Sequence, residues 1–493
     1  MAGTPTFDLL IVGGGINGAG IARDAAGRGL TVLLVEKEDL ASHTSSASTK
    51  LIHGGLRYIE QLEFRLVRES LIERERLWRI APHIIRPLDF VVPQEGSTRP
   101  AWLVRLGLFL YDHLGGRKRL PATRIVDLAE DFRGDGLKVR TGKAFLYADC
   151  LVDDSRLVVL NALDAAERGA RIATRTKLIH AERGTDLWQA TLHGPAGQEQ
   201  VSARVVINAA GPWVSDLLRR IHVESRRNIR LVKGSHIVLP RLYAGEHAFL
   251  IQNPDRRVVF AIPFEREFTL IGTTDSFWDA EPGSPEIDDA EIAYLLDAVR
   301  RTFAKEAERD DIVWTYSGIR PLFDDGSRNA ARVTRDYSLD LDMRGAPVLS
   351  IFGGKLTTYR RLAEQVLHRL QTIFPGAGPS WTASAPLPGG NLADGGLANL
   401  RIEFPSVPIA LLDRLARTYG TRARQILSGD LGGNIAGDLT ESEVHYLVQH
   451  EWARTAEDIL FRRTKLGLHL PATAAPRLEE VLRQMNQGST HAA

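Results

Sequence analysis

The sequence predicts an α/β protein in which a nucleotide-binding domain is interleaved with a β-rich substrate domain and followed by an all-helical C-terminal domain. Strand and helix patterns alternate over residues 1–36, as in a parallel sheet. β-rich stretches then interrupt sheet-and-helix pieces near 1–60, 140–215 and 340–372, and a Pro- and Gly-rich linker spans 375–396. We expect an interleaved unit over 1–385, with its substrate part mainly at about 75–140 and 215–335, and a helical domain over 386–493.

The segment from Phe7 to Glu36 carries the strongest motif. An apolar strand leads into GGGING (13–18), a helical run follows, and a second apolar strand ends in Glu36. Gly13, Gly15 and Gly18 fit G-x-G-x-x-G, in which the glycines allow a tight turn, close approach to a pyrophosphate and close packing of helix on strand. The amides that open the helix favour phosphate, and Glu36 can accept from ribose hydroxyls. The segment therefore predicts a dinucleotide site.

The remaining elements follow in chain order. The polar stretch 41–50 suits a loop whose hydroxyls contact phosphate or sugar. We expect a helix over Phe64–Ile80, with its Glu and Arg residues on a solvated face, and a strand over 205–210 that ends in a small-residue turn. Further strands are expected at 237–239, 258–260, 270–271 and 348–352, and helices at 288–302, from about 358, and at 409–419, 441–452, 455–463 and 477–484.

Composition excludes several classes of protein. Lys plus Arg is 62 and Asp plus Glu is 61, so the net charge of +1 indicates no nucleic-acid partner. The single cysteine, Cys150, fits a reducing compartment, and no Cys/His cluster has the spacing of a metal site. We expect neither a signal peptide nor a membrane span. The apolar run 102–111, flanked by arginines, fits either an anionic membrane surface or a core helix, and we favour the core helix.

Several longer motifs resemble FAD-dependent glycerol-3-phosphate dehydrogenase in the correct order along nearly the whole chain. They are GGGINGAG (13–20), SSASTKLIHGGLRY (45–58), KGSH (233–236), GTTD (272–275), SGIRPL (317–322), GGKLTTY (353–359) and TAEDILFRRTK (455–465). The bacterial aerobic respiratory enzymes of the family are most similar. The resemblance implies a Rossmann-like FAD domain of the two-dinucleotide-binding, glutathione-reductase type. It also implies a helical cap domain at the C-terminus.

The resemblance also implies an activity and a location. The reaction would be oxidation of sn-glycerol 3-phosphate to dihydroxyacetone phosphate, with non-covalent FAD as hydride acceptor and membrane quinone as electron acceptor. The protein would lie peripherally on the cytoplasmic face of the inner membrane, with a homodimer as a further expectation.

Arginine offers the planar fork of donors that a substrate phosphate requires. Arg320, in the SGIRPL segment, is the first candidate for this clamp, and Arg57, after Gly54-Gly55, is the second. Tyr58, Lys355 and Thr357 are the other residues expected to contact the substrate.

Two histidines compete for the role of base, because a neutral imidazole suits proton acceptance near neutral pH. We favour His236, after Lys233-Gly234-Ser235, over His53, and expect the other to polarise the substrate oxygen or to contact the flavin. Lys355, at a strand-to-helix junction, would stabilise negative charge on the reduced flavin. The residues expected to contact FAD are Gly13, Gly15, Asn17, Gly18, Glu36, Thr44, Ser45, Ser46, Ser48, Leu51, Ala210, Gly211, Gly354, Lys355, Leu356 and Thr357.

Two other functions remain open at this point. An oxidase would perform the same half-reaction but pass electrons to O2 and release peroxide. A flavin-binding membrane-surface module without turnover is the third possibility, and the set His53, Arg57, His236, Arg320 and Lys355 argues against it.

Overall fold

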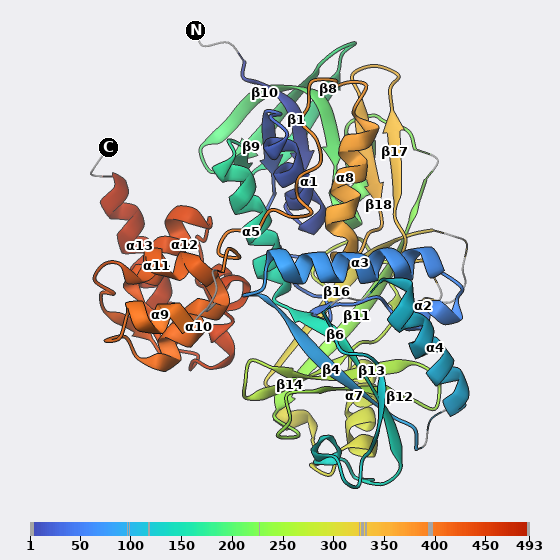
Figure 1. Cartoon of the computed structure of the whole chain (residues 1–493). Coiled ribbons are helices and arrows are strands. Elements are labelled where there is room, and N and C mark those ends of the chain that lie inside the picture. The colour runs from blue at the N-terminus through green and yellow to red at the C-terminus, as the bar shows by residue number, and fades with distance from the viewer. Residues whose placement is uncertain are drawn as a thin grey trace.

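Two sheets and a helical domain form the molecule (Figure 1). The computed structural model describes residues 4–490 except 96, 98, 117–118, 226, 325, 327–329, 331–332 and 393–397, and of residues 57 and 486–490 it describes only the backbone. The nucleotide-binding sheet lies at the top of Figure 1, the second sheet lies below it, and the C-terminal domain lies to one side. Helix α3 (Phe64–Ile80) crosses between the two sheets.

The first sheet has the order β17-β18-β10-β1-β2-β7, with β9 and β8 continuing from β10. Its strands are β1 Thr6–Val12, β2 Val32–Val35, β7 Arg171–Ala173, β8 Lys177–Arg183, β9 Trp188–Gly194, β10 Gly197–Asn208, β17 Ser338–Asp342 and β18 Val348–Phe352. Strands β18, β10, β1, β2 and β7 run parallel. The expected parallel sheet is thus confirmed.

Helices cover this sheet because its central strands are apolar on both faces. On β1, Leu9 and Ile11 pack with α1 (Ile16–Gly27), α5 (Asp154–Glu167) and α8 (Tyr359–Arg369), which share one core. Leu10 points to the other face, toward a core that includes α6 (Val214–Arg220) and the β8–β9 hairpin. The glycine turn after β1 therefore starts from a rigid, buried strand.

The second sheet has the order β15-β11-β14-β13-β12-β4-β6-β3, with β16 paired to β11 and β5 to β6. Its strands are β3 Leu51–Ile52, β4 Ile85–Pro93, β5 Arg124–Asp127, β6 Lys143–Val152, β11 Ile229–Pro240, β12 Ala248–Gln252, β13 Val258–Phe264, β14 Phe268–Gly272, β15 Ser276–Phe277 and β16 Trp314–Phe323. Helix α7 (Asp289–Thr302) packs on it. Antiparallel pairing of β11 with β16 sets Val232 opposite Arg320 and His236 opposite Tyr316, so two motifs distant in sequence lie side by side.

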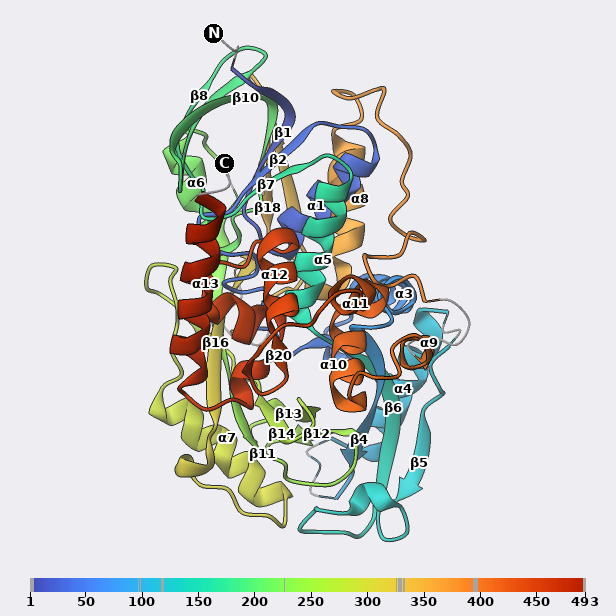
Figure 2. The same cartoon turned by 90° about the vertical axis from the view of Figure 1, so that its left-hand side faces the viewer.

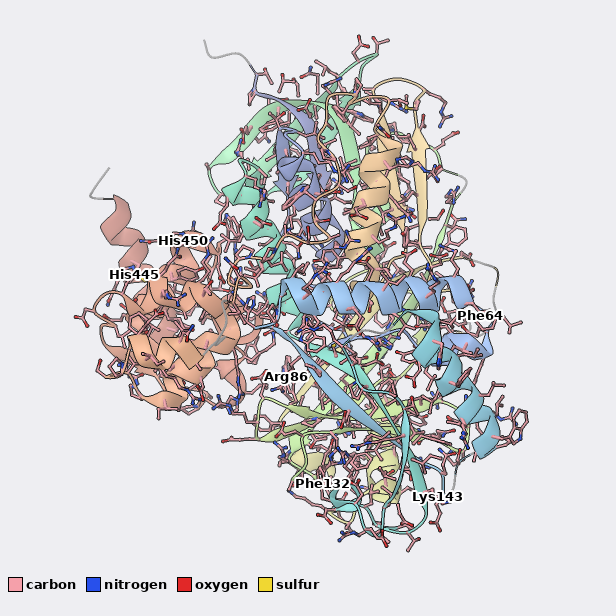
Figure 3. All side chains as sticks on the ribbon, viewed as in Figure 1. Phe64, Arg86, Phe132, Lys143, His445 and His450 are labelled. Carbon is pink, nitrogen blue, oxygen red and sulfur yellow. The ribbon has the colours of Figure 1, made fainter. Side chains whose placement is uncertain are left out.

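The C-terminal domain has its own apolar core between residues 400 and 482. It contains α9 Ala398–Glu403, α10 Ile409–Tyr419, α11 Ala423–Leu427, α12 Glu441–His450, a π-helical segment Asp458–Arg463 and α13 Ala474–Thr490. It also contains a short hairpin of β19 (Asn434–Ala436) and β20 (Leu439–Thr440) that an all-helical prediction misses. His445 and His450 mark α12 in Figure 3. Short 3-10 turns occur in the chain at 132–134, 211–213, 309–311, 356–358, 420–422 and 466–468.

Buried ion pairs join this domain to the nucleotide-binding sheet, and Figure 2 shows it lying against α5. Asp39, which follows β2, accepts from Arg462 Nε at 2.7 Å and from both terminal nitrogens of Arg463 at 2.8 Å. On α5, Arg156 Nη2 donates to Glu451 at 2.8 Å. The C-terminal domain therefore braces the loop that follows the second strand.

Helix α4 (Ala101–Leu114) differs from its prediction as a core helix. Its residues are all described, and only Leu108 and Tyr111 among them are buried. Trp102 is 68% exposed and Phe109 is 57% exposed, because α4 rests on α3 and on α2 (Arg57–Glu60) by one narrow face. Figure 3 places Phe64 at the end of α3 next to α2 and α4, in the same region. Among the described residues, no helix is long and apolar enough to cross a bilayer.

Candidate active site

A cavity of about 730 Å³ lies where the carboxyl ends of β1, β10 and β18 meet the second sheet. Its wall includes Gly13, Gly15, Asn17, Glu36, Thr44, Ser45, Ser48, Leu51, Ala210, Gly211, Gly354, Leu356 and Thr357, all predicted to contact FAD. His53, Tyr58, Arg320 and Lys355 line the same cavity. Segments from three distant parts of the chain thus converge on one space.

The glycine turn packs closely against the neighbouring backbone and leaves no room for side chains. Gly13 has φ +118, and a Cβ there would lie 2.4 Å from the carbonyl oxygen of Ala209. Gly18 does not line the cavity as the described residues form it; a Cβ on Gly18 would lie 1.9 Å from the Gly13 oxygen, so its role is close packing of α1. Asn17 Oδ1 is buried with no hydrogen-bond partner among the described residues. This orphaned acceptor and the bare glycine backbone fit a bound dinucleotide.

The carboxylate of Glu36, which is predicted to accept from ribose hydroxyls, here accepts the backbone N–H of Gly14 at 2.7 Å and that of Glu38 at 2.9 Å. Burial raises the pKa of Glu36, while those two N–H groups oppose the rise. Lys37 Nζ lies 3.7 Å from the ring centroid of Trp213 at the same end of the cavity. Trp213 is a wall residue that the sequence analysis missed, although it follows the Gly211-Pro212 turn directly.

The hydroxyls of residues 44–48 form hydrogen bonds with other parts of the protein, which hold this loop in place. Thr44 Oγ1 donates to the Ile319 carbonyl at 2.6 Å, and Ser48 Oγ donates to Asp154 at 2.7 Å. Ser45 Oγ accepts the Ile16 N–H at 3.0 Å, at the start of α1. Ser46 Oγ donates to the His43 carbonyl at 3.1 Å, and among the described residues Ser46 lines a smaller neighbouring cavity instead of this one.

Two arginines that line the cavity pair with one carboxylate, that of Asp275. Arg320 is ion-paired through Nη1 with Asp275, and its Nη2 donates to Thr273 Oγ1 at 2.7 Å. Arg335 Nη2 lies 3.3 Å from the same Asp275 oxygen. Arg335 was missed on sequence because no glycine-rich motif surrounds it. The side chain of Arg57, the second predicted clamp, lies outside the described part of the chain.

The two histidines occupy different positions. His53 lines the cavity, and Thr357 Oγ1 bonds to its backbone, 3.3 Å from both its nitrogen and its oxygen. His236 is 0% exposed and lies behind the wall as the described residues form it; its Nε2 is 3.1 Å from Thr49 Oγ1. Its ring stacks on Tyr316 at 4.7 Å. Burial, reinforced by the charges of Arg320 and Lys50, lowers the pKa of His236 well below its ordinary value.

Lys355 follows Gly353 and Gly354, whose φ angles are +85 and +113. Its Nζ lies 4.4 Å from the ring centroid of Tyr58 and 3.5 Å from Ser70 Oγ. Burial lowers the pKa of Lys355. The lysine amine therefore lies between the Tyr58 ring and the Ser70 hydroxyl, beside the cavity.

Known proteins resemble this chain over nearly its full length. Residues 8–360 match the FAD dependent oxidoreductase family, and residues 380–490 match the C-terminal domain of alpha-glycerophosphate oxidase. The chain is 53% identical to D-erythritol 1-phosphate dehydrogenase of Brucella abortus, with 95% of this chain and 96% of the relative covered. It is 47% identical to aerobic glycerol-3-phosphate dehydrogenase of Escherichia coli, with 98% of each covered.

A solved structure agrees with these relatives. The glycerol-3-phosphate dehydrogenase from Bacillus halodurans, complexed with FAD, superposes with a TM-score of 0.78 at 26% identity, covering 98% of this chain and 90% of that one. The predicted cofactor and fold class are thereby confirmed, and the glycine turn, Asn17 and Glu36 are the features of this chain that fit FAD. The chain belongs to the family of FAD-dependent oxidoreductases that includes the glycerol-3-phosphate dehydrogenases.

Proposed function

We propose that this protein oxidises sn-glycerol 3-phosphate to dihydroxyacetone phosphate and passes the electrons to membrane quinone. Relatives named glycerol-3-phosphate dehydrogenase, at 47% and 50% identity, support the substrate. The observation that carries the proposal is that Arg320 and Arg335, both paired with Asp275, line the cavity that His53 and Lys355 also line. Those groups match a phosphorylated alcohol that must lose a proton and a hydride.

The arginine pair would bind the phosphate. Two guanidinium groups against one carboxylate leave an excess of positive charge among these three groups. Arginine forks form paired, charge-assisted hydrogen bonds with phosphate oxygens. Arg57 remains the second candidate from the sequence for binding this phosphate.

His53 would take the hydroxyl proton, because it lines the cavity whereas His236 lies behind Thr49. FAD supplies the hydride acceptor when bound. Thr357 holds the His53 backbone, and Lys355 places positive charge where the cavity gains negative charge during oxidation. His236, neutral through its lowered pKa, would orient Thr49 without charging the site.

Anaerobic titration with glycerol 3-phosphate tests the half-reaction. The substrate should bleach the visible absorbance of bound flavin, and a spectrum that stays oxidised would rule out glycerol 3-phosphate as the substrate. Reoxidation of the reduced flavin then shows whether quinone or O2 is the preferred electron acceptor. Rapid return of absorbance with a soluble quinone, at a low yield of peroxide in air, fits the dehydrogenase; the reverse pattern fits an oxidase.

A four-carbon substrate is the second candidate. The identity to D-erythritol 1-phosphate dehydrogenase, 53%, exceeds the 50% identity to glycerol-3-phosphate dehydrogenase of Pseudomonas aeruginosa. Either polyol phosphate would use the same arginines for its phosphate. The ratio of kcat/KM for D-erythritol 1-phosphate and sn-glycerol 3-phosphate decides between them.

The outer face of α2–α4 is the proposed contact with the cytoplasmic face of the inner membrane. Leu62 is 73% exposed and Trp102 68%, and Leu106 and Phe109 are exposed beside them. Arg68 on α3 and Arg105 on α4 are also exposed, and their charges suit anionic lipid. Trp102→Glu should abolish cosedimentation with anionic vesicles while leaving flavin reduction intact. Equal binding by the variant and the wild type would assign the contact elsewhere.

A further inference from the structure

The backbone that carries His53 is held by two side chains, Thr357 on the cavity wall and Tyr111 behind it. Thr357 Oγ1 bonds to the His53 backbone at 3.3 Å, and the N–H of Gly54 donates to Tyr111 Oη at 2.7 Å. Both polar atoms of the His53–Gly54 peptide therefore have fixed partners. A peptide held at its oxygen and its N–H fixes the backbone from which the His53 side chain projects.

Tyr111 belongs to a buried polar cluster. Its hydroxyl donates to the Asp149 carboxylate at 2.8 Å, and Arg74 Nη1 donates to the same carboxylate at 2.6 Å and to the Ala148 carbonyl at 3.1 Å. Tyr111, Asp149 and Arg74 are each at most 3% exposed. Burial raises the pKa of Asp149, and Arg74 and the Tyr111 hydroxyl oppose the rise. An anion held in this way keeps the Tyr111 proton directed at Asp149 and leaves the phenol oxygen to accept from Gly54.

The cluster brings together elements that the reaction itself does not use. Arg74 lies on α3, Tyr111 on α4 and Asp149 on β6. A Cβ on Gly54 would lie 2.6 Å from Leu71 and 2.7 Å from Tyr111, so the loop and the two helices are in close contact. The position of α4 is thus transmitted to the loop through one hydroxyl.

We propose that Tyr111, with Asp149 and Arg74 behind it, is a positioning residue that sets the orientation of His53 for proton removal. Because α4 also carries the exposed apolar face, Tyr111 is a polar link between the helix that carries that face and the active-site loop. The inference rests on the proposed oxidation of a polyol phosphate at this site.

Tyr111→Phe tests the inference, with Tyr147→Phe as its matched control. Tyr147 is also buried, and its ring centroid lies 5.8 Å from that of Tyr111. We expect Tyr111→Phe to keep its FAD and to lower the limiting rate of flavin reduction by about tenfold or more, with substrate Kd changed by less than about twofold, because the arginines are untouched. Tyr147→Phe should match the wild type. A wild-type limiting rate in Tyr111→Phe, or equal losses in both variants, would overturn the inference.

Two further measurements keep the outcome unambiguous. Hydrogen exchange of the wild-type holoenzyme should find the Gly54 amide strongly protected, and exchange at the rate of an open loop would overturn the inference even if Tyr111→Phe does not fold. Flavin bleaching of the wild type by glycerol 3-phosphate is the reference. If the wild type stays oxidised, the proposed function fails; if it bleaches and Tyr111→Phe bleaches equally fast, only the positioning role fails.

Discussion

Arg320→Lys keeps a positive charge on the cavity wall but removes the planar fork. In the structure the Arg320 guanidinium uses two nitrogens at once, one on Asp275 and one on Thr273 Oγ1 at 2.7 Å. Lysine presents a single compact ammonium in place of that fork. The substitution therefore isolates hydrogen-bond geometry from charge.

The size of the effect follows from one lost charge-assisted hydrogen bond. Such a bond contributes about 1.5–3 kcal/mol, which corresponds to roughly 10- to 150-fold in affinity. Arg335, which also pairs with Asp275, remains in the variant and keeps the loss from being total. Plain glycerol carries no phosphate, so its weak oxidation should change by less than about threefold.

The assay is anaerobic flavin reduction with each substrate, fitted for Kd and limiting rate. We expect the Kd for glycerol 3-phosphate to rise and the limiting rate to change little. If glycerol and glycerol 3-phosphate respond to the substitution alike, Arg320 does not bind the phosphate.

Three other perturbations probe the scaffold. Gly13→Ala places a methyl group 2.4 Å from the Ala209 oxygen at φ +118, so the purified variant should lack FAD and should melt at a lower temperature; full flavin content would contradict the close approach. Asp39→Ala leaves buried Arg463 without its carboxylate and should cost about 3 kcal/mol in urea unfolding, whereas Asp413→Ala, in an exposed pair with Arg401, should cost less than about 1 kcal/mol. Equal costs would show that the Asp39 cluster contributes no more than a surface pair. Burial lowers the pKa of His247 to about 4. The unfolded chain therefore binds more protons between that pH and about 6.5, and the unfolding free energy falls as pH drops through this window. His247→Gln should remove about 2 kcal/mol of the loss between pH 7 and pH 5, and an unchanged pH dependence would rule the histidine out.

The local elements were predictable because their patterns are short-range. The glycine turn, the apolar strands around it and helices such as Phe64–Ile80 and Ile409–Tyr419 were predicted from neighbouring residues alone. The charged residues of α3 show where prediction from neighbouring residues fails. Glu73 and Arg74 were assigned to a solvated face, yet they are buried because Arg360 and Asp149, far away in sequence, pair with them. Strand β6 is a second example. It lies in residues 140–215, which the sequence analysis assigned to the nucleotide-binding sheet, but it belongs to the second sheet because it pairs with β4.

The sequence predicted which residues line the site better than it predicted how those residues are arranged. Gly13, Gly15, Gly354 and Lys355 belong to recognisable motifs, and all four lie on the cavity wall. Arg335 has no such motif around it, and only the fold brings it to Asp275. The depth of His236 behind Thr49 depends on the pairing of β11 with β16 and with β14, which no single segment encodes. The network around Tyr111 likewise exists only once α3, α4 and β6 meet.

The central claim is that a flavin beside the arginine pair removes a hydride from a phosphorylated polyol. Its most direct test is the visible spectrum of the purified protein during anaerobic addition of sn-glycerol 3-phosphate. We predict a yellow protein that bleaches on addition of the substrate and recovers its absorbance with a soluble quinone. A protein that binds FAD but keeps its oxidised spectrum with both glycerol 3-phosphate and D-erythritol 1-phosphate would contradict the account.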